Sequence, residues 1–350
     1  MRGIALCLVL VLLFGGRIKA QDGCATTQLE SGGFGRVTPG EANNVRDAPI
    51  STGELVGQIP GDGAFAMTEN DPVCAGSRLW VEVVYADFTG WTVEANGTDY
   101  WVVPYDATSY EDSVVRFIYP TDFLTEIETE TVPAQEQMGG RYPIRQEYTL
   151  GMDIDEENIN RFFYRMIVMP TADITDDAPL ALESLEKLRA LLINQPALDE
   201  SIFEIYDPNE PSDETSFLPA DPLFLGARRT FISSAHYITA QNGAGVGFVT
   251  MYAQDILPIH NFGLFYNALI LTDDGEFMAI LRIPIRTDEV MDDYREFDFP
   301  ANWDSLYAGH IINTTNLLDS LAPDDWQPSL DTLATIAGSI YVKGDIPDLD

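Results

Sequence analysis

The sequence predicts an α+β protein, in which an all-β barrel at the N-terminus is followed by an antiparallel sheet packed with helices. Three observations support this prediction. Between residues 35 and 104, short β-prone runs alternate with turns such as Pro-Gly, Gly-Asp-Gly and Asn-Gly, which is typical of a small closed barrel. Between residues 231 and 285, longer β-prone runs flank two glycine-containing turns, as in antiparallel hairpins. Apolar residues recur at helical spacing over residues 182–192 and again after residue 306.

Residues 1–20 have the pattern of a secretory signal peptide. Arg2 precedes an unbroken apolar run, residues 4–14, that is too short to span a bilayer as a stable anchor. We therefore expect cleavage after Ala20, export of the chain, and no membrane insertion once the signal has been removed.

Export changes how the three cysteines are interpreted. Cys7 lies within the predicted signal, which leaves Cys24 and Cys74 in the exported chain. An isolated pair of cysteines in an oxidising compartment most often forms a disulfide. We predict that bridge, and two free thiols are the alternative.

The charge of the chain limits its partners. There are 56 Asp and Glu against 19 Lys and Arg, which gives a formal net charge of −37. This field repels phosphate backbones and anionic membrane surfaces, so we expect neither as a partner. Attraction of cations or basic surfaces is one interpretation of the charge, and solubility of an exported protein is the simpler one.

The first predicted domain covers residues 24–105. Three local patterns occur there in order, at residues 44–49 (NVRDAP), 79–83 (LWVEV) and 90–92 (GWT). In this order and at this spacing they resemble the bacterial SH3-type domain of secreted and wall-associated proteins. The resemblance implies an SH3-like barrel that acts as a binding module, and it does not name a ligand.

Aromatic side chains of this domain are the candidate ligand-binding residues, because they offer large rigid surfaces for stacking on sugars or peptides. Trp80 and Trp91 lie in the middle of predicted strands, so we assign both to the core of the barrel. The side chains predicted to bind a ligand are Tyr85, Tyr100, Trp101 and Tyr105.

Residues 106–112 (DATSYED) are predicted to join this domain to an α+β domain at residues 113–343, and residues 344–350 form an acidic tail. The central sheet of the second domain is predicted from two hairpins, with turns at residues 242–245 and 273–275. Residues 195–226 contain five prolines and many acidic residues, which indicates an exposed loop. The other expected strands lie at 114–119, 127–132, 145–150 and 164–169, and the expected helices at 180–194, 306–321 and 328–340.

Two further resemblances concern the second domain. An early FIYP segment at residues 117–120, a late hairpin and a closing helix that ends near residues 339–340 resemble the layout of the PsbP/Mog1-like sandwich. Residues 241–255 and 263–285 are similar to a domain that follows SH3-type modules in uncharacterised exported bacterial proteins. Neither resemblance implies an activity.

The residue patterns of common hydrolases are absent from the sequence. Both cysteines of the exported chain lie in or beside the predicted barrel, which excludes the Cys–His wall-peptide hydrolases. The three histidines, His236, His260 and His310, are widely spaced, and there is neither an HExxH nor a GxSxG pattern. Ser233, Ser234 and His236 lie on a predicted strand, where neighbouring side chains alternate between faces.

Other kinds of site are equally poorly supported. Residues 153–157 (DIDEE) alternate acidic side chains like a calcium loop but lack glycine at the sixth position. The sequence therefore indicates no catalytic residue, no metal site and no cofactor. A glycosidase with paired carboxylates stays open, because 56 acidic residues provide many candidate pairs.

These observations lead to one preferred function. We expect an exported, non-catalytic binding protein of the bacterial cell envelope or extracellular space, whose SH3-type module engages cell-wall glycan or peptide. The first alternative is an extracellular hydrolase of glycans or esters with its site in the C-terminal domain. The second is a scaffold in which the barrel docks only against its own second domain. The sequence leaves the oligomeric state open.

Overall fold

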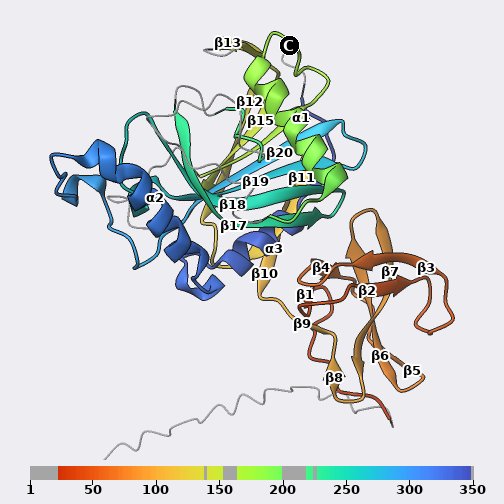
Figure 1. Cartoon of the computed structure of the whole chain (residues 1–350). Coiled ribbons are helices and arrows are strands. Elements are labelled where there is room, and N and C mark those ends of the chain that lie inside the picture. Colours follow the sequence, from red (N-terminus) through yellow and green to blue (C-terminus); the bar gives the residue numbers. More distant parts are fainter. Residues whose placement is uncertain (1–22, 138–139, 153–163, 199–217, 224–226, 348–350) are drawn as a thin grey trace, which may run out of the picture.

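The structure is a computed structural model that describes residues 23–137, 140–152, 164–198, 218–223 and 227–347 (Figure 1). An N-terminal part made of strands lies beside a larger C-terminal part made of strands and helices. The predicted signal at residues 1–20, the acidic alternation at residues 153–157 and most of the predicted loop at residues 195–226 lie outside the described residues. No helix in the described ranges is long and apolar enough to cross a membrane.

The predicted α+β class is wrong, because the described residues are mostly β: 42% lie in strands and 18% in helices. The larger sheets have nine, three and seven strands, and only three α-helices accompany them within the described ranges. The sequence predicted helices as the main cover of the central sheet. Part of that cover is a small second sheet, whose residues Val115 and Phe117 are buried in the same core as the helices. The α-helices are α1 (Pro179–Asn194), α2 (Trp303–Asp319) and α3 (Leu330–Gly338), and the 3₁₀ turns are Asn261–Gly263, Tyr294–Glu296 and Pro323–Asp325.

The N-terminal part is one antiparallel sheet of nine short strands. Its order is β3-β2-β7-β6-β4-β1-β9, with β5 paired to β6 and β8 paired to β7. Alternate residues such as Val81 and Val83 point into a common core. Trp80 is also buried but lies outside that cluster, and Trp91 is only partly buried. The strands are β1 (Phe34–Val37), β2 (Asn43–Arg46), β3 (Leu55–Ile59), β4 (Ala64–Met67), β5 (Val73–Ala75), β6 (Arg78–Tyr85), β7 (Phe88–Asn96), β8 (Asp99–Tyr100) and β9 (Val102–Pro104).

The C-terminal part contains a seven-stranded antiparallel sheet in the order β12-β15-β16-β20-β19-β18-β17. A three-stranded sheet, β10-β11-β21, includes the segment that the sequence predicted as the joint between domains. The strands are β10 (Ala107–Glu111), β11 (Val115–Pro120), β12 (Glu126–Val132), β13 (Gln135–Gln137), β14 (Gly140–Tyr142), β15 (Arg145–Gly151), β16 (Arg165–Pro170), β17 (Arg228–Ala240), β18 (Gly243–Ala253), β19 (Phe265–Thr272), β20 (Phe277–Pro284) and β21 (Tyr341–Val342). β13 and β14 pair only with each other.

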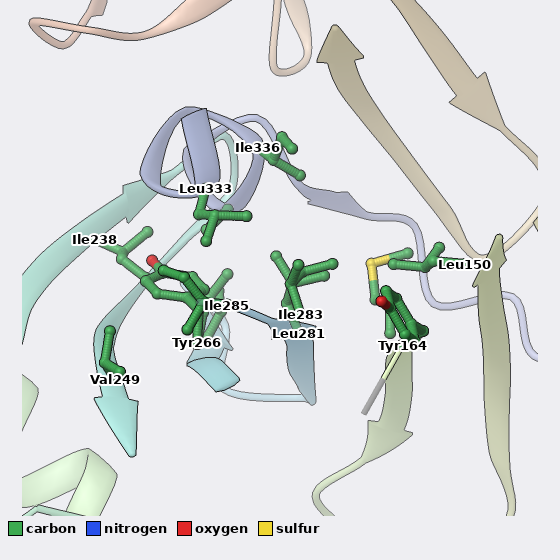
Figure 2. Close-up of a cluster of buried hydrophobic side chains, with 14 of the residues drawn as sticks. Leu150, Tyr164, Ile238, Val249, Tyr266, Leu281, Ile283, Ile285, Leu333 and Ile336 are labelled. Atoms are coloured by element: carbon green, nitrogen blue, oxygen red, sulfur yellow. The ribbon is translucent and has the colours of Figure 1, made fainter. Parts of the chain in front are cut away.

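Both faces of the seven-stranded sheet are covered. Successive side chains of a strand point to opposite faces, and the central strands carry apolar side chains on both. On one face, Leu185 and Leu188 of α1 pack against residues such as Ile280. On the other face lie α2, α3 and the three-stranded sheet, and Figure 2 shows Leu333 of α3 directed toward Tyr266. The two cores together fix the sheet between two layers.

The first predicted hairpin turn is displaced. The sequence placed the turn at residues 242–245, but β17 ends at Ala240 and β18 already begins at Gly243. A Cβ at Gly243 or Gly245 would collide with a backbone carbonyl of the neighbouring strand β19. These glycines therefore allow close approach between strands rather than a positive φ.

The two parts contact each other through the turn between β6 and β7. The Arg116 guanidinium of β11 donates to the carbonyl of Ala86 at 2.7 Å and to Gln241 Oε1 at 3.0 Å. Gln241 Oε1 also accepts from the backbone N–H of Ala86 at 3.2 Å. Arg116 lies 4.9 Å from the centre of the Tyr341 ring. One arginine and one glutamine thus connect the N-terminal sheet to the strands of the C-terminal part.

Candidate functional site

Two of the four predicted ligand-binding residues are held within the N-terminal sheet. Tyr85 is 4% exposed and belongs to the core, where its ring centre lies 5.7 Å from that of Phe88. Burial raises the pKa of Tyr85. Tyr105 is half-buried with Arg36 at 5.9 Å from its ring centre, and burial raises the pKa of Tyr105 to about 12. The hydroxyls of both tyrosines are buried and lack a hydrogen-bond partner among the described residues.

The other two, Tyr100 and Trp101, are adjacent, half-buried and fixed by hydrogen bonds. The Tyr100 hydroxyl donates to the carbonyl of Thr26 at 2.6 Å. The Trp101 backbone N–H donates to the carbonyl of Glu94 at 2.8 Å, and its carbonyl accepts from the Thr38 N–H at 2.9 Å. The Tyr100 ring and the Trp101 backbone are thus held by neighbouring segments before any ligand arrives.

Three residues from distant positions extend this pair of rings. The Arg78 guanidinium lies 5.7 Å from the centre of the Trp101 ring, and it donates to Ser51 Oγ at 3.1 Å. Ile50, beside Ser51, is 47% exposed although it is apolar. We call Ile50, Ser51, Arg78, Tyr100 and Trp101 the Trp101 surface. Sequence reasoning missed Arg78, Ser51 and Ile50, because only the fold brings Arg78 to the Trp101 ring and Ser51 to Arg78.

The predicted disulfide is confirmed, and it lies next to this surface. Cys24 and Cys74 are bonded, with their Cα atoms 5.9 Å apart. Ala75, beside Cys74, is the register partner of Arg78. Thr26, which accepts the Tyr100 hydrogen bond, follows Cys24 by two positions. The bridge therefore ties together the two segments that support Arg78 and Tyr100. A disulfide is compatible with an exported protein.

Glu94 holds the same N-terminal segment against β7. Its carboxylate accepts from the Thr27 hydroxyl at 2.8 Å and from the Gln28 N–H at 2.6 Å, and the residue is fully buried. Burial raises the pKa of Glu94, and these hydrogen bonds lower it by a smaller amount. The carboxylate thus keeps residues 27 and 28 in place, next to Thr26, whose carbonyl accepts the Tyr100 hydrogen bond.

The three histidines lie in separate surroundings. His236 Nε2 is 3.1 Å from the Tyr266 hydroxyl, and His260 Nδ1 accepts from the Gly263 N–H at 3.1 Å. His310 packs against the ring of Trp303 at 5.2 Å. Burial lowers the pKa of all three. Within the described ranges, no group of three or more His, Cys, Asp or Glu could hold a metal ion.

A β-bulge in β17 gathers serine, histidine and aspartate side chains, which the expected alternation of a regular strand would keep apart. The register shifts between Ser233 and His236, and Ser234 has φ 55°. Asp319 at the end of α2 accepts from the Ser233 hydroxyl and from the Ser234 N–H, both at 2.8 Å. The His236 ring nitrogens instead face the Ser234 carbonyl and the Tyr266 hydroxyl. Neither nitrogen is placed to accept a serine proton, so this group lacks the geometry of an activated nucleophile.

On the face of the sheet covered by α1, a buried ion pair joins β20 to residues 218–223. Arg282 and Asp221 are 1% and 3% exposed, and the guanidinium donates two hydrogen bonds to the carboxylate. Asn267, the register partner of Arg282 on β19, is fully buried, and its amide has no hydrogen-bond partner in the part of the chain described. The pair fixes residues 218–223 across the sheet.

No protein-family model matches this chain, and no curated protein matches it. Any functional conclusion therefore depends on the residues themselves.

Proposed function

We propose that this chain is an exported, non-catalytic binding protein of the bacterial cell envelope or extracellular space, and that its Trp101 surface binds cell-wall glycan or peptide. The observation that supports the proposal is the grouping of Tyr100, Trp101 and Arg78 at one end of the N-terminal sheet. Figure 1 places β8, which ends at Tyr100, at the end of the N-terminal part that lies away from α2 and α3.

The chemistry of the surface suits such a ligand. The Trp101 ring offers a flat apolar face for a sugar ring or a peptide side chain. The Arg78 guanidinium carries five N–H donors, which suit the acetamido, peptide carbonyl or carboxylate groups of a wall polymer. Because the disulfide and the hydrogen bonds of Tyr100 already fix the surface, less conformational entropy is lost on binding.

The hydrolase alternative has less support. The one gathering of serine, histidine and aspartate that we find in the described ranges directs both His236 nitrogens away from the serine hydroxyls. The scaffold alternative is compatible with the contact of Arg116 with Ala86 and Gln241. It differs from our proposal in predicting no binding to the wall at all.

The test is sedimentation of the full chain with purified bacterial cell wall. We expect the wild-type chain to sediment with the wall, and Trp101→Ala to weaken the apparent affinity by about tenfold or more, as expected for a central aromatic contact. Arg78→Gln should weaken it to a smaller extent. Phe299→Ala removes an exposed aromatic ring of the C-terminal part and serves as the matched control with unchanged binding.

Three outcomes would contradict the proposal. Absence of wild-type sedimentation at several ionic strengths would favour the scaffold. Equal binding by the wild type and Trp101→Ala would place the contact elsewhere. Turnover in a screen of glycan and ester substrates would instead support the hydrolase.

A further inference from the structure

Two Asn-Gly pairs occur in the chain, at residues 96–97 and 242–243. Asparagine followed by glycine loses ammonia readily, because glycine has no Cβ to hinder the attack of its backbone nitrogen on the asparagine side chain. The reaction requires an asparagine side chain that is not held and a main chain that can turn toward it. The two pairs differ in both respects.

The first pair meets both requirements. Asn96 ends β7, and it is the register partner of Asp99 across the turn to β8. The Asn96 side chain is exposed and makes no hydrogen bond among the described residues. Gly97 has φ 65°, nothing lies within 4 Å of the place that a Cβ would occupy, and its N–H donates to no acceptor in the described ranges. The turn can therefore bring the Gly97 nitrogen to the Asn96 side chain.

The second pair is held in place. The Asn242 amide donates to the carbonyl of Val342 at 2.7 Å, and its oxygen accepts from the Val342 N–H at 2.9 Å. The Asn242 carbonyl also accepts from the Asp273 N–H at 2.9 Å. Gly243 is the first residue of β18, and a Cβ there would lie 2.4 Å from the carbonyl oxygen of Leu271. Attack at Asn242 would first require this region to open.

We propose that Asn96 is a site of non-enzymatic modification, at which the side-chain amide is converted to a carboxylate, and that Asn242 is protected. The Gly97 nitrogen loses its proton and forms a bond with Cγ of Asn96, while the bond between Cγ and Nδ2 breaks and ammonia leaves. Water then opens the resulting succinimide ring. Opening at Cγ gives aspartate, and opening at the main-chain carbonyl gives isoaspartate, in which the chain runs through the side chain. Water is the only co-reactant.

The new carboxylate would lie beside the Trp101 surface. Asn96 is the register partner of Arg78, so the two side chains lie on the same face of the sheet. Its other register partner is Asp99, whose charge would repel the carboxylate toward Arg78. The carboxylate would thus compete with Ser51 and the Trp101 ring for the Arg78 guanidinium. The expected effect on wall binding rests on the proposed function, whereas the modification does not.

The test follows both Asn-Gly pairs in the full chain at mildly alkaline pH, in water enriched in oxygen-18. Solvent oxygen then marks each residue that reacts during the incubation, and peptic peptides prepared at low pH are analysed by mass spectrometry. We expect conversion in the folded chain to be at least about tenfold faster at Asn96 than at Asn242, because Asn242 reacts only after local opening. In concentrated guanidinium chloride the two rates should become similar.

The matched control is Asn96→Gln, which should not be converted, because attack on the longer side chain would need a larger ring. Equal rates at the two pairs in the folded chain would overturn the proposal. Conversion of Asn96 only in denaturant would overturn it as well.

A second measurement tests the pairing with Arg78 without the wall. The pKa of the new carboxyl in Asn96→Asp, followed by NMR, should be lower than in the Asn96→Asp, Arg78→Gln double variant. Equal pKa values would show that the carboxylate does not pair with Arg78.

Sedimentation with the wall tests the effect on binding. Asn96→Asp should weaken wall binding by about threefold, the effect of a cross-strand ion pair, and Asn96→Gln should leave it unchanged. Equal wall binding by Asn96→Asp and the wild type would refute this effect. If the wild type itself does not bind the wall, the proposed function fails, and the mass spectra still decide whether Asn96 is modified.

Discussion

Removal of the Cys24–Cys74 disulfide should destabilise the N-terminal sheet far more than the rest of the chain. The two cysteines are 50 positions apart. In the chain-entropy treatment, closing a loop of that length stabilises the fold by about 4 kcal/mol at 25 °C. With a urea m-value of about 2 kcal/mol/M, the Cys24→Ser, Cys74→Ser double variant should lower the midpoint of N-terminal unfolding by about 2 M.

The assay must separate the two parts of the chain. Hydrogen exchange with mass spectrometry in increasing urea gives one transition for peptides from residues 24–105 and another for peptides from residues 113–343. We expect the first transition to move and the second to stay in place, because the bridge connects only segments of the N-terminal part. A loss below about 1 kcal/mol, or equal shifts in both transitions, would refute the reasoning.

Three further predictions concern two buried carboxylates and the contact between the two parts of the chain. Burial raises the pKa of Glu94 in the folded chain above its value in the unfolded chain. The protonated carboxyl therefore favours the folded state, and this contribution to stability is lost as the pH rises through the folded pKa. Glu94→Gln should therefore raise the melting temperature of the N-terminal part at pH 7 and show a smaller gain at pH 4; a gain independent of pH would contradict this. Asp221→Asn removes the carboxylate facing the buried Arg282 guanidinium and should lower the free energy of unfolding, measured in urea, by about 3 kcal/mol. The Asp221→Leu, Arg282→Met double variant should recover most of that loss. Equal losses in the two variants would refute this reasoning. The double variant Arg116→Ala, Gln241→Ala removes the hydrogen bonds of these two side chains with Ala86 and should increase the radius of gyration in solution X-ray scattering, with both parts still folded. An unchanged radius would show that other contacts hold the two parts together.

Local chemistry made much of the strand pattern predictable. The predicted run at residues 79–84 lies within β6, and residues 81–85 alternate between buried and partly buried positions, as a strand with one face in the core requires. The turn predicted at residues 273–275 is present, and Gly275 there has φ 73°, which suits glycine. The helix predicted at residues 180–194 is α1, which begins at Pro179.

The fold class could not be predicted as well, because it depends on how elements share the cover of a sheet. Residues 106–112 were predicted as a joint between domains, but β10 lies there and pairs with β11. β21 has two residues and is a strand only because it pairs with β11. Short strands of this kind raise the share of residues in strands, so the structure is mostly β and not α+β as predicted.

The candidate site was predictable only in part, for a related reason. Tyr100 and Trp101 were identified by their aromatic character, which is local. Arg78 and Ser51 were not, since 27 positions separate them in the sequence and the fold joins them. Likewise, the contact of Ser233 with Asp319 depends on a bulge that sequence alternation did not indicate.

The most direct test of the central claim, that the Trp101 surface binds the wall, is the exchange of backbone amides in the full chain with and without soluble cell-wall fragments. We predict slower exchange in peptides that contain residues 50–51, 78 and 99–101 when fragments are present, with unchanged exchange in α1. Slower exchange confined to the C-terminal part, or none at fragment concentrations that saturate sedimentation, would contradict the claim.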